Sequence, residues 1–180
     1  VLPVACYNRP RKLRLLTLPI EVPTTPVLRS IFGGFLLQEE DVGADPEMKW
    51  VCTNDNMPST ELCSFGIMVT KHLRSNAIAL VRSQGNTLQL IGAGMGNPNR
   101  LISTQQAIEK AQENGASDLS SCLLVSDAFF PFRDNVDRAA EAGIRTIIQP
   151  GGSIRDKEVR TACTEHNIAM ACTGRRHFRH

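Results

Sequence analysis

The sequence predicts an α/β fold in which a mixed sheet is covered by helices. From residue 76 onwards, short apolar runs alternate in strict order with segments whose apolar residues recur at helical spacing. Such alternation is typical of a sheet with helices packed on its faces. The chain has 180 residues and 42% hydrophobic content, which is enough to bury one core without disulfides or a structural metal. We therefore expect one ordinary α/β domain.

The expected elements can be placed along the chain from these patterns. A helix is expected over residues 60–73, where Leu62, Phe65 and Val69 have helical spacing. A later helix should stop at Gly115, because glycine tolerates the left-handed conformation of a helix end. The elements expected after residue 75 are, in order, strands at 76–82 and 87–91 joined by a turn, a helix at 101–114, a strand at 122–126, a helix at 134–142, a strand at 144–149, a helix at 154–166 and a strand at 168–172.

The N-terminal part of the chain lacks this regular pattern. The Pro-rich stretch from Pro19 to Pro26 is typical of an extended connector. We therefore expect residues 1–26 to be a connector and the globular domain to span residues 27–180. The chain begins at Val1 rather than Met, as expected after processing or trimming, or in a fragment of a longer protein.

Two segments lie between the connector and the regular part. Residues 30–38 are apolar with a central pair, Gly33-Gly34, as expected of a buried strand whose backbone is closely approached by packing or by a ligand. Residues 41–58 are polar and indicate a loop.

The composition excludes several classes of protein. The formal net charge of +2 comes from 20 basic and 18 acidic residues mixed along most of the chain, so no nucleic acid and no membrane is expected as a partner. The six cysteines form no CxxC pair, and the chain lacks the HxE and PCxxC signature of zinc deaminases, so zinc is not expected. The cysteines should be buried thiols in a reducing compartment. No apolar stretch or signal-peptide layout is present near the N-terminus, and a cytoplasmic location is expected.

In α/β sheets, ligands bind beyond the carboxyl ends of the strands. The loops to consider are those that follow Ile91, Ser126, Gln149 and Cys172. The first of them, GAGMGNPNR at residues 92–100, has three alternating glycines that let the backbone approach a flat or anionic group, or that only make a hairpin exit flexible. It is not a nucleotide-triphosphate loop, because no Gly-Lys-Ser/Thr follows.

The loop SDAFFPFRDN at residues 126–135 has an unusual density of aromatic side chains. Phe129, Phe130 and Phe132 lie within four positions, and an intervening proline stiffens the segment. Apolar rings at the carboxyl end of a strand suit stacking on a heteroaromatic ligand. The alternative is an aromatic plug of the core, with Asp134 capping the next helix.

Two further loops also have a functional and a structural interpretation. The segment PGGSIRDKE leads into a helix whose start can bind an anion, or Ser153 and Asp156 only cap that helix. The basic tail at residues 175–180 is either a frayed end or a phosphate-binding segment, in which the guanidinium groups of its arginines bind the phosphate.

A last candidate precedes the first regular strand. Asn76 has a carboxamide that can read a ligand amide, although an asparagine there is more often a turn or cap residue. Lys71-His72 is interpreted as surface and not as an acid/base pair, because adjacent residues point to different faces of a helix.

Taken together, five segments resemble 5-aminoimidazole-4-carboxamide ribonucleotide (AICAR) transformylase, the folate-dependent domain of the bifunctional purine biosynthesis protein family. They are, in order, RSNAIAL, GAGMGNPNR, SDAFFPFRDN, QPGGSIRD and TGRRHFRH. The resemblance runs from about Val27 to His180 and implies a single three-layer, cytidine-deaminase-like unit with a mixed sheet covered by helices. In the family this is the second of two such units.

The resemblance also implies an activity and a set of site residues. The activity is formyl transfer from 10-formyltetrahydrofolate to the 5-amino group of AICAR in de novo purine (IMP) biosynthesis, by a phosphoribosylaminoimidazolecarboxamide formyltransferase that is incomplete on its own. The family pattern assigns Asn76 to catalysis; Phe129, Arg176 and His180 to the substrate; Arg100, Pro131, Asp134 and Asn135 to the folate; and Ser75 and Asp127 to a monovalent cation such as potassium.

The chain departs from the family where catalysis is concerned. The family's Lys-His pair lies in its first unit within a KHxNPCG-like motif, which this chain lacks, and Lys71-His72 is no substitute because Leu73-Arg74 follows it. Arg74, Asn97 and Asn99 also differ from the residues common in the family. The AICAR amino group is a poor nucleophile and needs a positioned base. We therefore expect a homodimer or a hetero-assembly in which another chain, or a missing segment, supplies the Lys-His half. The alternative is a non-catalytic folate- and nucleotide-binding or assembly subunit.

Overall fold

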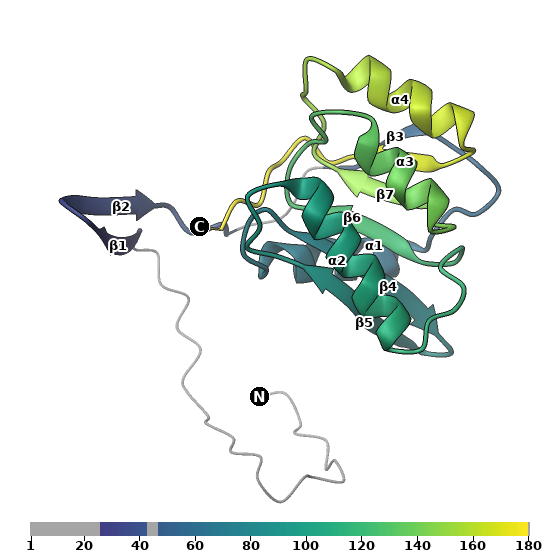
Figure 1. Ribbon diagram of the computed structural model, residues 1–180, viewed down its shortest axis with the longest axis horizontal. Helices are drawn as coiled ribbons and strands as arrows, with labels where there is room; N and C mark the ends of the chain where they lie inside the picture. Colours follow the sequence, from purple (N-terminus) through teal and green to yellow (C-terminus); the bar gives the residue numbers. More distant parts are fainter. Residues whose placement is uncertain (1–25, 43–46, 180) are drawn as a thin grey trace, which may run out of the picture. The chain divides into compact units, whose positions relative to one another are not determined.

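The computed structural model describes residues 26–42 and 47–179 (Figure 1). The contacts within the chain divide it into two units, with the boundary between Glu40 and Asp41. The family resemblance placed the start of the domain earlier, at Val27. Residues 1–25 of the expected connector lie outside the described residues.

The first unit contains a β-hairpin, in which β1 (Val27–Ile31) pairs antiparallel with β2 (Gly34–Gln38). The expectation of a single buried strand over residues 30–38 is therefore wrong. Gly33 has a φ of +80°, in the left-handed region that glycine tolerates, and the chain reverses direction there. The glycine pair serves the turn and not a close approach, since a Cβ added at Gly33 or Gly34 meets nothing within 4 Å.

The second unit is built on a six-stranded sheet with the order β3-β8-β7-β6-β4-β5. The parallel strands β6, β7 and β8 adjoin antiparallel pairs at both sides, so the expected mixed sheet is confirmed. β3 lies inside residues 41–58, where the sequence indicates a loop, because its four residues are too few to show an alternating pattern. The strands are β3 (Lys49–Cys52), β4 (Ile78–Gln84), β5 (Thr87–Gly94), β6 (Leu123–Ser126), β7 (Thr146–Gln149) and β8 (Ala169–Cys172).

Helices cover both faces of this sheet, which confirms the three-layer α/β fold (Figure 1). Leu80 and Leu124 belong to the core beneath α2, α3 and α4, whereas Val81 and Leu123 belong to the core beneath α1. Neighbouring strand residues thus point to opposite layers. No helix among the described residues is long and apolar enough to cross a membrane. The helices are α1 (Thr60–Lys71), α2 (Arg100–Glu113), α3 (Asp134–Glu141) and α4 (Asp156–Glu165).

One edge of the sheet brings the amino ends of β3 and β4 together with the carboxyl ends of the other four strands. The register pairs Ile78 with both Gly94 and Ser126, and Gln149 with Cys172. Because β4 runs antiparallel to its neighbours, its amino end lies beside the carboxyl ends of β5, β6, β7 and β8. We call this the carboxyl edge. The segment before β4 and the loops after the other strands therefore meet where α/β sheets bind ligands.

Two glycines of the Gly-rich segment let α2 pack closely on β5. A Cβ at Gly92 would lie 2.0 Å from the carbonyl oxygen of Ala107, and one at Gly94 would lie 2.0 Å from that of Ser103. Both glycines belong to β5 itself, and of the three alternating glycines only Gly96, with a φ of +70°, lies in the turn that follows. The first two glycines are therefore explained by helix packing without a ligand.

Replacing Gly94 by Ala should destabilise the fold by about 3 kcal/mol or more, because the added methyl group meets backbone atoms and α2 must move away from the sheet. Thermal unfolding measures this as a fall in Tm of about 6 °C or more. Gly34→Ala is the control, since its new Cβ meets nothing within 4 Å. Equal Tm values for the two variants would contradict the close contact between α2 and β5.

Candidate functional site

A buried ion pair lies at the carboxyl edge. Arg100 is the first residue of α2, and its Nη2 atom lies 2.9 Å from Oδ1 of Asp127, which follows β6. Arg100 is 8% exposed and Asp127 is 0% exposed. Within the described part of the chain, Nε of Arg100 and Oδ2 of Asp127 have no hydrogen-bond partner. The pair therefore leaves one donor and one acceptor buried without a hydrogen-bond partner among the described residues.

The guanidinium of Arg100 connects three of the segments singled out in the sequence. Its Nη2 also donates to Oδ1 of Asn76 at 2.7 Å, and its Nη1 donates to the carbonyl oxygen of Phe129 at 3.1 Å. Asn76 precedes β4, Arg100 ends the Gly-rich segment, and Phe129 lies in the loop after β6. These three predicted residues, together with Asp127, thus form one contiguous cluster.

The carboxamide of Asn76 is held at both ends. Its Nδ2 donates to the carbonyl oxygen of Asn97 at 2.9 Å, while its Oδ1 accepts from Arg100. The Asn97 side chain in turn donates to Gln106 at 2.8 Å, and the Ser103 hydroxyl donates to the carbonyl oxygen of Asn76 at 2.8 Å. An amide nitrogen has a second hydrogen and an amide oxygen a second lone pair. Asn76 is therefore oriented in advance and still able to contact a ligand.

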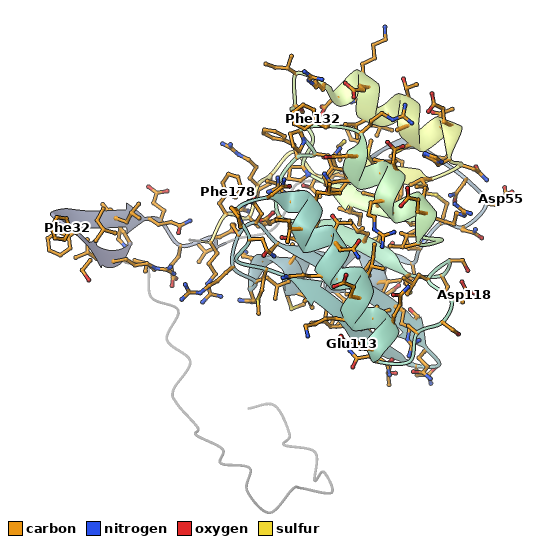
Figure 2. The ribbon with its side chains drawn as sticks, in the orientation of Figure 1. Phe32, Asp55, Glu113, Asp118, Phe132 and Phe178 are labelled. Atoms are coloured by element: carbon orange, nitrogen blue, oxygen red, sulfur yellow. The ribbon has the colours of Figure 1, made fainter. Side chains whose placement is uncertain are left out.

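The three phenylalanines of the loop after β6 have different environments. Phe130 is fully buried in the core, Phe129 is half-buried, and Phe132 is 46% exposed. Figure 2 labels Phe132, which lies at the outside of the ribbon. The guanidinium carbon of Arg155 lies 4.7 Å from the centroid of the Phe132 ring. The core-plug interpretation therefore holds for Phe130, whereas Phe129 and Phe132 keep ring surface on which a ligand can stack.

The other predicted residues of this loop lie at the start of α3. Pro131 and Asp134 are half-buried. Oδ1 of Asp134 accepts from both the main-chain N–H and Nδ2 of Asn135 at 2.8 Å, and the N-cap of α3 is Arg133, so the expectation that Asp134 caps this helix is wrong. Asn135 is 1% exposed and accepts a hydrogen bond from Thr104, which ties α3 to α2.

The C-terminal segment packs against the carboxyl edge, so the frayed-end interpretation is wrong for its described residues. His177 is 3% exposed, and its main-chain N–H donates to the carbonyl oxygen of Asp127 at 2.8 Å. The main chain of Arg179 bonds to Ser75, whose N–H donates to the Arg179 carbonyl at 2.9 Å and whose hydroxyl accepts from the Arg179 N–H at 3.0 Å. The tail thus borders the segment that carries Asn76.

The tail arginines differ in what they contact. Nη2 of Arg175 lies 2.6 Å from Oδ1 of Asp41, so this guanidinium is bound within the fold. Arg176 is exposed, with its guanidinium carbon 5.4 Å from the centroid of the Phe178 ring. Of the two tail residues predicted to hold the nucleotide, Arg176 is thus open to solvent, and His180 lies outside the described residues.

Asp41 collects three basic side chains and was not anticipated. Besides Arg175, it accepts from Nδ1 of His177 at 2.6 Å and lies 3.7 Å from Nζ of Lys71. Burial by itself raises the pKa of Asp41, but the hydrogen bond from His177 and the charges of His177, Lys71 and Arg175 outweigh it and lower the pKa. Lys71 is therefore half-buried with a structural partner, while His72 is exposed, so the surface interpretation holds for His72 and not for Lys71.

The loop after β7 is bonded to the first residue of its own helix. The carboxylate of Asp156 accepts from the N–H of Gly152 at 2.8 Å and from that of Ser153 at 3.0 Å, while the Ser153 hydroxyl accepts from the N–H of Arg155 at 3.1 Å. Ser153 and Asp156 thus bond to N–H groups just before the helix, although the N-cap of α4 is Arg155, which makes no side-chain cap hydrogen bond. An anion at this helix start would have to compete with a carboxylate that is already in place.

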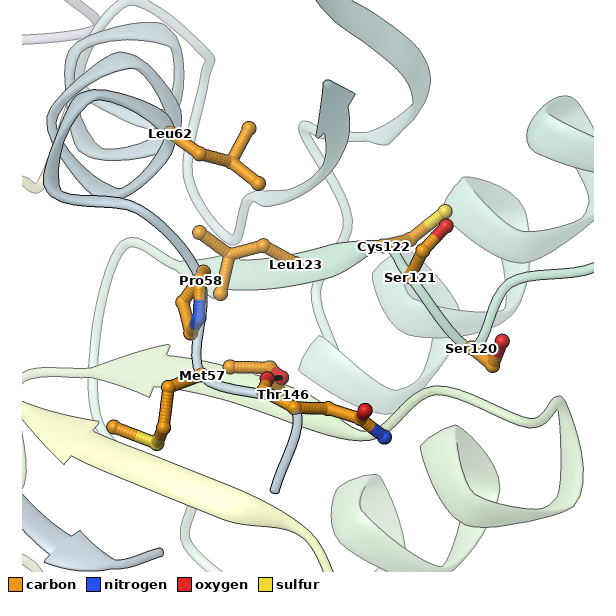
Figure 3. Close-up of a pocket in the computed structure, with 9 residues that line it drawn as sticks. Met57, Pro58, Leu62, Ser120, Ser121, Cys122, Leu123 and Thr146 are labelled. Carbon is orange, nitrogen blue, oxygen red and sulfur yellow. Dashed lines mark hydrogen bonds between the residues drawn. The ribbon is translucent and has the colours of Figure 1, made fainter. Parts of the chain in front are cut away.

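Two surface hollows lie away from the ion pair. One of about 260 Å³ lies at the opposite, amino edge of the sheet, between Leu62, Cys122 and Thr146 (Figure 3). Burial raises the pKa of the Cys122 thiol, which makes it a poor nucleophile. The other, of about 410 Å³, is lined by Ile154 and Arg155 among others. Since Arg155 stacks on Phe132, only this second hollow adjoins the aromatic loop.

The carboxylate of Asp127 fits poorly to the monovalent cation that the resemblance implies. It is already neutralised by the guanidinium of Arg100 at 2.9 Å, which repels a second positive charge. The hydroxyl of Ser75 is engaged by the main chain of Arg179. Over the described residues, no group of three or more His, Cys, Asp or Glu side chains is placed to hold a metal ion.

Three residues at this edge were missed by sequence reasoning: Asp41, Gln149 and His177. Gln149 is 1% exposed, and its Oε1 accepts from the N–H of Phe130 at 2.7 Å. A glutamine that ends an apolar strand is a usable signal, because a buried carboxamide must have partners. Asp41 ends an acidic run whose pattern is that of a solvated loop, so no signal distinguished it.

Arg100→Met should destabilise the fold by about 3–5 kcal/mol, because it leaves the carboxylate of Asp127 buried without its counter-charge. Urea unfolding measures the loss. The double variant Arg100→Met/Asp127→Asn removes both charges and should be more stable than the sum of the two single changes predicts. Strict additivity would contradict the pairing.

Asp41→Asn should lower Tm at neutral pH, and the difference from the parent protein should shrink in acid. Because the folded-state pKa of Asp41 is lowered, its ion pairs stabilise the fold above the pKa of an unfolded aspartate, about 4. That stabilisation is lost as the pH falls through the lower, folded value. Melting curves of both proteins at neutral pH and below about pH 4 test this; a difference that does not change with pH would rule out the carboxylate charge as its source.

Comparison with known families and proteins agrees with the sequence resemblance. Residues 4–110 match the sequence model of the AICARFT/IMPCHase bienzyme family. The protein named bifunctional purine biosynthesis protein PurH from Desulfitobacterium hafniense is 44% identical over 156 residues, and that from Aquifex aeolicus is 45% identical over 154 residues; each alignment covers 85% of this chain and 29% of the relative. The Streptococcus uberis protein of the same name is 39% identical over 180 residues, which is 96% of this chain and 33% of the relative.

This chain therefore spans about a third of the length of these relatives. Among solved structures, one similar chain is a diaminohydroxyphosphoribosylaminopyrimidine deaminase/5-amino-6-(5-phosphoribosylamino)uracil reductase from Thermotoga maritima. It aligns with a TM-score of 0.38 and 18% identity, over 61% of this chain and 34% of that chain. This similarity is too low to carry an argument. The family match covers more than half of the sequence, including the hairpin, α1 and the Gly-rich segment. The chain belongs to the AICARFT/IMPCHase bienzyme family.

Proposed function

We propose that this chain acts in purine biosynthesis as the part of an AICAR transformylase that binds folate and nucleotide. In the reaction, 10-formyltetrahydrofolate gives its formyl group to the 5-amino group of AICAR. The observation that supports this most is the meeting of three family segments at Arg100, which contacts Asn76, Asp127 and Phe129 at once. Segments far apart in the sequence thus form one site.

The chemistry of this cluster suits a planar, amide-bearing anion. The half-buried ring of Phe129 offers a stacking surface. The carboxamide of Asn76 is held in one orientation and matches the carboxamide of AICAR in donors and acceptors. The exposed guanidinium of Arg176 can bind the phosphate of a nucleotide.

The folate would lie towards the start of α3. Pro131 and Asp134 are half-buried there, and the exposed Phe132 ring carries the guanidinium of Arg155 on one face. A pterin ring has both an apolar face and a hydrogen-bonding rim, so it needs a ring or proline surface and a nearby carboxylate. Asn135 is buried between α2 and α3 and would act on the folate only by placing Asp134.

Formyl transfer needs a positioned base, and the buried histidine at this edge, His177, is already bonded through Nδ1 to Asp41 at 2.6 Å. The amino nitrogen of AICAR attacks the formyl carbon and loses a proton, and the tetrahedral intermediate collapses as N10 of tetrahydrofolate leaves and takes up a proton. Such help from a general base and acid is worth about 10²–10⁴-fold in rate. Lys71 is bound to Asp41, and His72 is exposed. We therefore assign the Lys-His half to another chain, in a homodimer or hetero-assembly, or to the part of the longer relatives that this chain does not span.

The alternative function is that of a non-catalytic folate- and nucleotide-binding or assembly subunit. It is favoured because, within the described residues, Lys71 and His177 are both bound to Asp41 and His72 is exposed. A cation is left out of the proposal because the carboxylate of Asp127 is already neutralised by Arg100.

A formyl-transfer assay separates the two functions. This chain is mixed with 10-formyltetrahydrofolate and AICAR, alone and together with a polypeptide that carries the family's Lys-His motif, and folate absorbance is followed. Turnover that appears only in the mixture supports the transferase. If calorimetry detects folate binding but neither sample turns over, the chain is a binding subunit; if no folate binds at all, both functions are excluded.

Phe129→Ala should weaken AICAR binding and Asp134→Ala should weaken folate binding, each about tenfold, because one removes a stacking surface and the other a hydrogen-bonding carboxylate. Titration calorimetry measures the affinity. Both variants should keep a Tm within a few degrees of the parent, since neither side chain is fully buried. Phe130→Ala is the matched control: its ring is 0% exposed, so it should lose several kcal/mol of stability. A large loss of Tm with Phe129→Ala would instead make that ring part of the core.

A further inference from the structure

The peptide bond between Phe129 and Phe130 is held at both of its polar atoms by buried side chains. Arg100 donates to the carbonyl oxygen of Phe129 at 3.1 Å, and Gln149 accepts from the N–H of Phe130 at 2.7 Å. One contact comes from α2 and the other from the end of β7. Because the first is a donor and the second an acceptor, reversing this peptide would break both bonds.

Gln149 has no role in the proposed function, yet its burial is unusual. It is 1% exposed and is among the largest fully buried side chains. A carboxamide without partners is costly in such a place. Its Nε2 lies 3.3 Å from Sδ of Met170 in β8, and its Oε1 faces Phe130. Turning the amide over would put two donors face to face, so the contacts themselves fix which atom is the oxygen.

The two rings on either side of this peptide have different environments. Phe130 is fully buried in the core, whereas Phe129 is half-buried and its carbonyl oxygen contacts Arg100. The two hydrogen bonds hold ψ of Phe129 and φ of Phe130, and the Phe130 ring is fixed in the core. Together they tether the Cα atom from which the Phe129 ring projects, and so hold the position of the stacking surface.

We propose that Gln149 is the positioning residue for the ring of Phe129, acting through the Phe129–Phe130 peptide and not by touching the ligand. The identity of that ligand as folate or AICAR rests on the proposed function. The positioning itself rests only on the contacts of Gln149 with the loop.

The test compares two variants of the same strand. Gln149→Met keeps an unbranched side chain of similar length but cannot accept the bond from Phe130. Thr146→Val is the matched control: Thr146 is the first residue of β7, is 4% exposed, and donates to the carbonyl oxygen of Asn56 at 3.1 Å. Each change removes one buried bond between a side chain and the main chain, at opposite ends of β7. Gln149→Leu replaces Gln149→Met if the latter does not fold.

We expect both variants to lower Tm by a similar few degrees. Only Gln149→Met should shift the NMR signals of the Phe129 ring, speed hydrogen exchange at the Phe130 amide about tenfold, and weaken AICAR binding about tenfold. If the parent protein binds AICAR and Gln149→Met binds it as tightly as Thr146→Val does, the inference is wrong while the proposed function stands. If the parent protein does not bind AICAR, the proposed function fails. The NMR signals of the Phe129 ring then test the positioning role alone: unchanged signals in Gln149→Met overturn it, and altered signals support it.

Discussion

The ion pair between Arg100 and Asp127 is the interaction on which the carboxyl edge depends. Both side chains are buried, so neither charge is screened by water, and each requires the other. A lysine in place of Arg100 would offer one point charge, whereas the guanidinium reaches Asp127, Asn76 and the Phe129 carbonyl together. The loops are therefore arranged around one side chain, and their geometry follows from where that side chain lies.

The scaffold places this arginine through backbone packing. Because Gly94 has no side chain, the first turn of α2 at Ser103 can lie directly against the end of β5. Arg100, three residues earlier, then reaches across the amino end of β4 to the loop after β6. Gln149 meets the same loop from the parallel strand β7. Glycine packing, a buried charge pair and a buried carboxamide together fix a loop that contains no regular structure of its own.

Much of the fold could be predicted from the sequence because apolar runs and helical spacing report burial directly. Every expected helix and strand after residue 59 is present within three residues of its expected bounds. The hairpin at Gly33 and the strand β3 were missed, since a run of apolar residues does not show where a turn interrupts it and four residues show no period. Candidate residues were found as separate loops. That Arg100 joins them, and that Asp41 binds the tail, depends on contacts between residues far apart in the chain, which no local pattern records.

The central claim is that ligands bind at the carboxyl edge around Arg100. The most direct measurement is NMR mapping of backbone amides during titration with AICAR and a non-reactive 10-formyltetrahydrofolate analogue. The account predicts that the largest shifts occur at Asn76, at residues 96–100, at residues 127–134 and at residues 174–179. Shifts confined to the hollow at the amino edge, beside Cys122 and Thr146 (Figure 3), would contradict it.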